Sequence, residues 1–195
     1  MMATLLSADP IDQEEHLNRL IRLVSVTAIG ACFVLGTTAL WAADPPKKNW
    51  TPPAQKIYAQ KLSDDTMAKH PELLSITLHG VPPGQQDVYT MFAGSYTDRI
   101  GNPDDPDDID VSKKGITIID PRWHRTNDTD KKFVVLMPMR DKAGENIGLV
   151  VYAFKNPKNP STSATEKGFL AKSTALRDSL AKQIASYKAL FDPAK

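Results

Sequence analysis

Cysteine is almost absent from this 195-residue sequence, because the one cysteine, Cys32, lies inside an apolar segment near the N-terminus. The rest of the chain therefore has no disulfide, no thiol nucleophile, no cysteine-ligated metal and no haem-attachment pair. The lack of disulfides does not exclude export, because a domain of this size builds an adequate hydrophobic core without them.

The sequence also contains few glycines, carries a small net charge and has none of the common catalytic motifs. Ten glycines stand against 15 prolines, and the formal net charge is only +1, which is too small to indicate binding to nucleic acid or an anionic membrane. The sequence has no HExxH motif, nucleophile elbow, P-loop or glycine-rich dinucleotide turn. The histidines beyond residue 43, which are His70, His79 and His124, have no metal-ligand spacing. We therefore expect a protein without catalytic activity, cofactor or metal.

An uncharged apolar run occupies residues 23–43, directly after Arg19 and Arg22. A basic flank followed by an apolar run and small residues is typical of a secretory signal peptide, and the run is also long enough to span a bilayer. Three outcomes stay open: cleavage after Ala42 or Ala43, retention as a membrane anchor, and lipidation of Cys32. Each of them predicts a domain outside the cytoplasm, either free in the periplasm or anchored to the inner membrane.

A single domain over residues 51–195 follows a short tether at 44–50. Thr51, followed by two prolines, predicts the start of a helix that ends by His70, because Pro71 disfavours helical geometry in the residue before it. Apolar and polar residues then alternate from Leu74 to Leu78, which predicts a strand with one buried face. A second strand is expected at 88–93, after a turn rich in proline and glycine.

Aspartates crowd the segment at residues 104–110, where alternating oxygen ligands could bind calcium. The spacing does not match an EF-hand, and a capped helix explains the same residues better. Asp105 can cap the helix, Pro106 suits its first position, and acidic residues in the first turn complement the helix dipole. Lysines in the last turn and Gly115 after it complete the pattern of a short helix.

The strongest structural signal is a hairpin near the C-terminus. Apolar strands are expected at 116–119, 133–139 and 147–154, and the last two flank a connection at 140–146 that contains glycine. Both arms of this hairpin are continuously apolar, so we expect central strands. A capping box at 163–166 then introduces an amphipathic helix at 166–191, whose apolar stripe packs on the domain or on a partner.

The hairpin segment FVVLMPMRDKAGENIGLVVYAF resembles the last hairpin of Cache and PAS sensor domains. The likeness extends over residues 51–155. It implies an α+β fold: a PAS/Cache-like five-stranded antiparallel sheet with a long N-terminal helix and a C-terminal amphipathic helix. Cache sensors usually lie between two membrane helices, whereas no second apolar segment follows here. We therefore expect a free binder or an accessory subunit that reports to a membrane-bound partner.

One dense group of ligand-binding side chains follows the third expected strand: Arg122, Trp123 and His124. Arginine binds carboxylates through paired hydrogen bonds, and tryptophan provides an apolar wall or a face for a cation. Cache domains that bind small carboxylates or amines use such groups near this part of the fold. Alternatively, Arg122 pairs with the acidic loops and Trp123 is part of the core. Weaker candidates for the same pocket are Tyr96, Arg99 and His79.

These observations together predict an extracytoplasmic module that binds or senses a small carboxylate or amine and does not catalyse a reaction. The alternative is a structural or interaction protein, in which the helix at 166–191 binds a membrane partner and the sheet serves only as a scaffold.

Overall fold

The computed structural model describes residues 46–123 and 129–195. The signal peptide or membrane anchor predicted at 1–43 and the candidate residue His124 lie outside the described residues. None of the helices in these two described ranges is long and apolar enough to cross a membrane.

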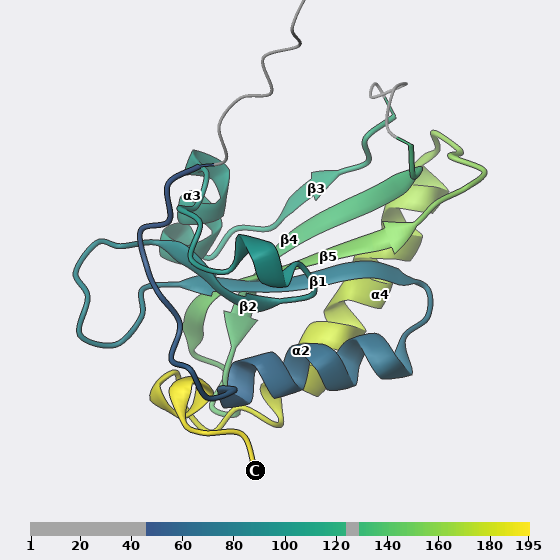
Figure 1. The fold of residues 1–195 in the computed structure, drawn as a ribbon. Coiled ribbons are helices and arrows are strands. Elements are labelled where there is room, and N and C mark those ends of the chain that lie inside the picture. Colours follow the sequence, from purple (N-terminus) through teal and green to yellow (C-terminus); the bar gives the residue numbers. More distant parts are fainter. Residues whose placement is uncertain (1–45, 124–128) are drawn as a thin grey trace, which may run out of the picture. The chain divides into compact units, whose positions relative to one another are not determined.

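A five-stranded antiparallel sheet in the order β2-β1-β5-β4-β3 organises the domain. The α+β class and its antiparallel sheet are thus as predicted, and the arrangement is consistent with a PAS/Cache-like fold (Figure 1). The strands β4 and β5 each have neighbours on both sides, which confirms that the apolar hairpin is central. The strands are β1 (Leu73–Gly80), β2 (Thr90–Gly94), β3 (Ile118–Asp120), β4 (Lys132–Arg140) and β5 (Asn146–Lys155).

Helices cover the two faces of the sheet unequally. One face carries α2 (Tyr58–Lys69) and α4 (Ser163–Ala181), and the other carries the shorter α3 (Pro106–Lys114) (Figure 1). Short 3-10 helices also form at η1 (Thr97–Arg99), between β2 and α3, and at η2 (Lys188–Phe191), after α4. Because α3 is short and packs mainly on β1, β4 and β5, it leaves part of its face of the sheet uncovered.

The helix expected from Thr51 begins seven residues later, at Tyr58, so that part of the prediction is wrong. Ile57 forms a bridge with Pro193, and the amide of Tyr58 donates to the carbonyl of Asp192. The preceding prolines suit this extended approach, because the residue before a proline avoids helical geometry. The expected end at His70 is confirmed. Trp50, at the end of the expected tether, packs edge-on against Phe191.

The short acidic helix forms as predicted. Asp105 is the N-cap of α3, its backbone amide bonds the Asp108 carboxylate, and Gly115 ends the helix in the left-handed conformation at φ 67°. The acidic first turn and the two lysines of the last turn match the dipole of the helix. The aspartates in this segment therefore have a structural role, because they cap α3 and complement its dipole.

The C-terminal helix is shorter than expected, and its N-cap lies one residue before the predicted cap. Thr162, rather than Ser163, is the N-cap and accepts a hydrogen bond from the amide of Thr165. The helix ends at Ala181 instead of continuing to 191, and the chain turns before η2.

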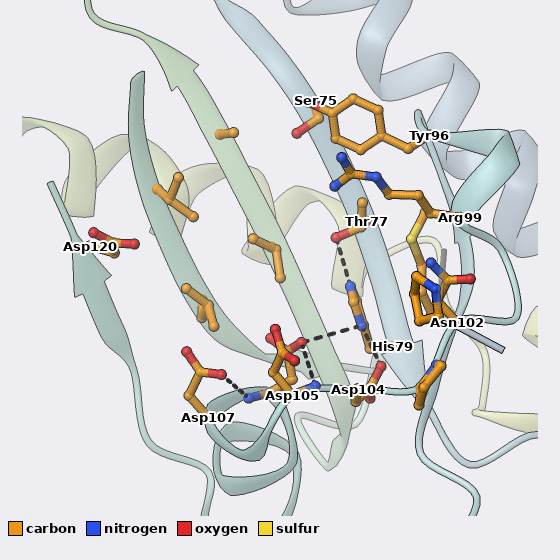
Figure 2. Close-up of a pocket in the computed structure, with 18 of the residues that line it drawn as sticks. Ser75, Thr77, His79, Tyr96, Arg99, Asn102, Asp104, Asp105, Asp107 and Asp120 are labelled. Carbon is orange, nitrogen blue, oxygen red and sulfur yellow. Dashed lines mark hydrogen bonds and ion pairs between the residues drawn. The ribbon is translucent and has the colours of Figure 1, made fainter. Parts of the chain in front are cut away.

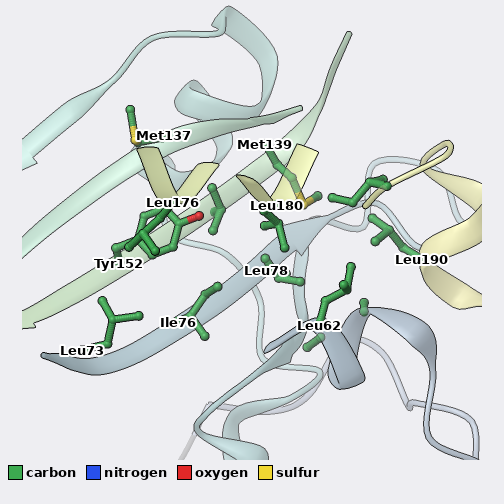
Figure 3. Close-up of a cluster of buried hydrophobic side chains, with 14 of the residues drawn as sticks. Leu62, Leu73, Ile76, Leu78, Met137, Met139, Tyr152, Leu176, Leu180 and Leu190 are labelled. Carbon is green, nitrogen blue, oxygen red and sulfur yellow. The ribbon is translucent and has the colours of Figure 1, made fainter. Parts of the chain in front are cut away.

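The apolar stripe of α4 belongs to the core of its own domain. Leu176 and Leu180 lie over the sheet and face Leu62 of α2 across the same buried cluster (Figure 3). The buried part of the stripe is therefore already covered within the chain.

Truncation of this stripe tests the packing. We expect Leu180→Ala to lower the free energy of unfolding by about 2–5 kcal/mol, because it removes buried methyl groups and leaves a cavity. The exposed Ser179→Ala, one position earlier, should change it by less than about 0.5 kcal/mol. Urea denaturation followed by circular dichroism measures both. Equal midpoints for the two variants would show that α4 does not pack on the sheet in solution.

Candidate functional site

A cavity of about 580 Å³ lies over the part of the sheet that α3 leaves uncovered. Its floor combines apolar side chains of β4 and β5 with three polar side chains of β1, namely Ser75, Thr77 and His79. Alternate residues of a strand point to the same face, so these three lie in a row (Figure 2). The sequence predicted one buried face for β1, but the structure buries this polar face as well.

His79 occupies a position where β1 and β5 approach each other closely. Gly148 of β5 has a positive φ of 138°, and a Cβ at this position would lie 2.5 Å from the carbonyl oxygen of His79. Only glycine fits such an approach without a shift of the backbone. The backbone of His79 is therefore fixed by the sheet, and its imidazole is directed toward the cavity (Figure 2).

Three cationic side chains line a further part of the cavity wall, which extends from η1 to the segment after β3, at opposite edges of the sheet. Arg99 extends from η1 with its guanidinium 4.7 Å from the centre of the Tyr96 ring, in a cation–π contact. Within residues 46–123 and 129–195, no carboxylate lies at ion-pair distance from this guanidinium. Lys132 of β4 also lines the cavity, as does Arg122. This part of the cavity suits an anionic group.

Arg122 is held in an unusual backbone conformation beside the cavity. Its φ is +60°, a region that residues other than glycine seldom adopt, and its Nε lies 2.7 Å from Oδ2 of Asp120. The backbone amide of Arg122 also donates to the Asp120 carboxylate. The pairing with an acidic residue that the sequence allowed is therefore present, while Arg122 still lines the cavity.

Acidic groups form the opposite part of the wall. His79 Nδ1 lies 2.7 Å from Oδ1 of Asp104 and 4.0 Å from Oδ2 of Asp108. His79 Nε2 lies 2.7 Å from Oγ1 of Thr77, so both ring nitrogens have partners (Figure 2). Asp105 and Asp107 at the start of α3 also line this part. The cavity thus has a cationic part and an acidic part, with His79 in the acidic one.

Burial raises the pKa of the Asp108 carboxyl from 3.8 to about 6. The nearby Asp104 and Asp107 carboxylates act in the same direction, whereas His79 acts against it. An acid whose pKa rises in this way is disfavoured in its charged form by its surroundings. The negative charge of this part of the cavity is therefore poorly compensated.

The structure brings together four of the six residues selected from the sequence, because His79, Tyr96, Arg99 and Arg122 all line the cavity. Trp123 does not line it and packs edge-on against Phe133 beside the core. This matches the core alternative that the sequence left open for Trp123.

Thr77, Asp104 and Asp108 line the cavity but were not predicted from the sequence as ligand-binding residues. The alternation of β1 could have identified Thr77, because it shares a strand face with His79. The aspartates were considered as a calcium site and were assigned to helix capping, and nothing in the sequence connected them with His79.

The raised pKa of Asp108 predicts a pH dependence of stability. The folded state favours the protonated carboxyl, so this contribution is complete below about pH 4 and is lost as the pH rises through about 6. Asp108→Asn keeps the group neutral and should raise the urea midpoint at about pH 7.5 while changing it little at about pH 4. His79, Asp104 and Asp107 also face this group, and they are unchanged in the variant.

Asp110→Asn on the same helix is the matched control, because Asp110 forms an exposed pair with Lys114. An increase in the midpoint that is equal for both variants, or equal at both pH values, would contradict the burial of the Asp108 charge.

No protein-family model and no curated protein sequence matches the chain. Among solved structures, the Escherichia coli DcuS sensor domain is 15% identical, with a TM-score of 0.34 over 61% of this chain and 71% of that one. The Agobacterium tumefaciens repressor BlcR is 11% identical, with a TM-score of 0.39 over 66% of this chain and 67% of that one. Both similarities are too distant to assign a family or a function.

Proposed function

We propose that this chain is an extracytoplasmic module that binds and senses a small carboxylate or amine, and that it does not catalyse a reaction. The observation that carries the proposal is the cavity beside the polar face of β1. A strand that buries a row of polar side chains under an open cavity provides hydrogen-bonding groups for a ligand. Its volume of about 580 Å³ lies within the usual range for small-molecule sites.

The charges of the cavity wall support a ligand of this class. A carboxylate would lie near Arg99, whose guanidinium has no acidic partner within the described ranges, and near Arg122 and Lys132. Guanidinium groups bind carboxylates through charge-assisted hydrogen bonds, often as a pair. An amine would lie at the opposite wall, near Asp104 and Asp108. The cation–π contact with Tyr96 positions the Arg99 side chain.

The proposed location outside the cytoplasm rests on the apolar run at 23–43 and its basic flank. A sensing role there implies a membrane-bound signalling partner. The alternative role, in which α4 binds the partner through its apolar stripe, is less favoured. Leu176 and Leu180 are already buried against the sheet, so exposing them would cost the stability that they provide.

Thermal shift measurements on the full chain test the proposal. We expect one or more compounds in a panel of acetate, malonate, glutarate, methylamine and putrescine to raise the melting temperature. At about a hundredfold excess over Kd the rise should be roughly 5–10 °C, because a ligand that binds only the folded state stabilises it by mass action. Arg99→Ala and Arg122→Ala should each remove most of the rise produced by a carboxylate.

Arg140→Ala is the control, because Arg140 bonds the hairpin carbonyl of Gly144 and does not line the cavity. The proposal fails if no compound in the panel shifts the wild-type protein. It also fails if both cavity variants retain the full shift of the control.

A further inference from the structure

Three side chains with metal-ligating atoms converge at the acidic wall of the cavity. His79 comes from β1 and Asp104 from the loop before α3 (Figure 2). Asp108 lies in the first turn of α3. One ligating atom from each residue lies within 4.8 Å of the other two. Ligands held around a single ion at about 2.1 Å lie roughly 3–4 Å apart, so small side-chain rotations would close the site.

The group is shielded from water and lacks a fixed positive charge. The side chains of His79, Asp104 and Asp108 are 10%, 0% and 16% exposed. Across residues 46–123 and 129–195, neither carboxylate has a lysine or arginine within ion-pair distance. Two buried carboxylates therefore share one imidazole, and a further positive charge would offset their burial.

An independent observation indicates a missing partner at Asp104. Its Oδ1 bonds His79, but its Oδ2 is buried and has no hydrogen-bond partner among the residues that the structure describes. A buried carboxylate oxygen without a donor costs free energy, and native structures seldom leave one in that state.

The surroundings of His79 also suit a metal ligand. Ligating histidines usually donate their other ring N–H to a nearby oxygen, which fixes the ring. His79 Nε2 lies 2.7 Å from Oγ1 of Thr77, which can accept that hydrogen bond while Nδ1 faces the two carboxylates. The first turn of α3 fixes Asp108 in the same way, because its Oδ2 accepts from the amide of Asp105.

We propose that His79 Nδ1 and the carboxylates of Asp104 and Asp108 bind one divalent transition-metal ion. One imidazole nitrogen with two carboxylates favours ions that accept mixed N and O ligands, such as Mn²⁺ or Zn²⁺, over the oxygen-only preference of Ca²⁺. The ion displaces the proton between His79 and Asp104, and water from the cavity fills its remaining positions. This site goes beyond the proposed function. It uses Asp104 and Asp108, which also form the proposed amine wall, but it does not use Arg99 or Arg122, so it does not depend on carboxylate binding.

Isothermal titration of the chelator-treated full chain with MnCl₂ and ZnCl₂ alone tests the site. We expect about one ion per chain, with at least tenfold weaker binding in Asp108→Asn and His79→Ala. Thr77→Val should weaken binding by about tenfold through loss of ring positioning. Asp110→Asn removes the same charge from the same helix at an exposed position and should bind as the wild type does.

Electron spin echo envelope modulation spectroscopy of the Mn²⁺-loaded chain provides a second readout. Modulation from an imidazole nitrogen should be present in the wild type and absent in His79→Ala. Circular dichroism shows whether each variant folds; if His79→Ala does not, Asp108→Asn and Thr77→Val still decide the affinity. The proposal is overturned if the wild type binds no ion. It is also overturned if Asp108→Asn binds as tightly as Asp110→Asn, since the ion would then be held by the acidic surface in general.

The same titrations separate the metal site from the proposed ligand function. Arg99→Ala should retain metal binding in full, because Arg99 contacts Tyr96 at the other part of the cavity. Metal binding without any carboxylate- or amine-induced thermal shift would leave the metal site standing and remove the proposed function. The reverse result would remove only the metal site.

Discussion

The alternation of side chains along β1 is the constraint on which the rest of the structure depends. Ile76 and Leu78 point to the core beneath α2 and α4, while Thr77 and His79 point to the opposite face. A shift of one residue in the register would exchange these faces and place His79 in the core. Pairing with β2 on one side and β5 on the other prevents this shift, so the core and the cavity are fixed by the same hydrogen bonds.

Uneven coverage of the sheet is what creates the cavity. The helices α2 and α4 bury one face fully, whereas α3 buries a smaller cluster around Val111 on the other. The aspartates at the start of α3 line the uncovered area, and its cationic side chains come from η1, β4 and the segment after β3. Because the residues that cap α3 are aspartates, the device that starts the helix also sets the charge of the cavity wall. The same carboxylates cap α3 and line the cavity. Their capping role therefore does not by itself show whether they also bind a ligand.

Local signals made the hairpin β4–β5, the helix α3 and the end of α2 predictable from the sequence. The wrong predictions concern places where segments far apart in the sequence contact each other. The start of α2 depends on pairing with Pro193, far along the chain, and no pattern near Thr51 reports that contact. Beyond Ala181 the apolar residues continue at helical spacing, but Ile184 and Leu190 reach the core from a turn and a 3-10 helix. Periodicity predicted the burial of Ile184, but it predicted Phe191 instead of the fully buried Leu190 and did not predict the backbone of this segment.

The site was only partly predictable for the same reason. Sequence reasoning selected His79 and the aspartate segment separately, because 25 residues separate His79 from Asp104. Folding brings them to 2.7 Å, and the resulting group has two buried carboxylates against one imidazole. Charge of this kind is stable in a protein interior when a counter-charge is supplied. The cationic wall cannot supply it, since Arg122 already pairs with Asp120 and Arg99 is held over Tyr96. In the two proposals the occupants therefore have opposite charges: the ligand carboxylate lies at the cationic side chains, and the metal ion lies between His79 and the two aspartates.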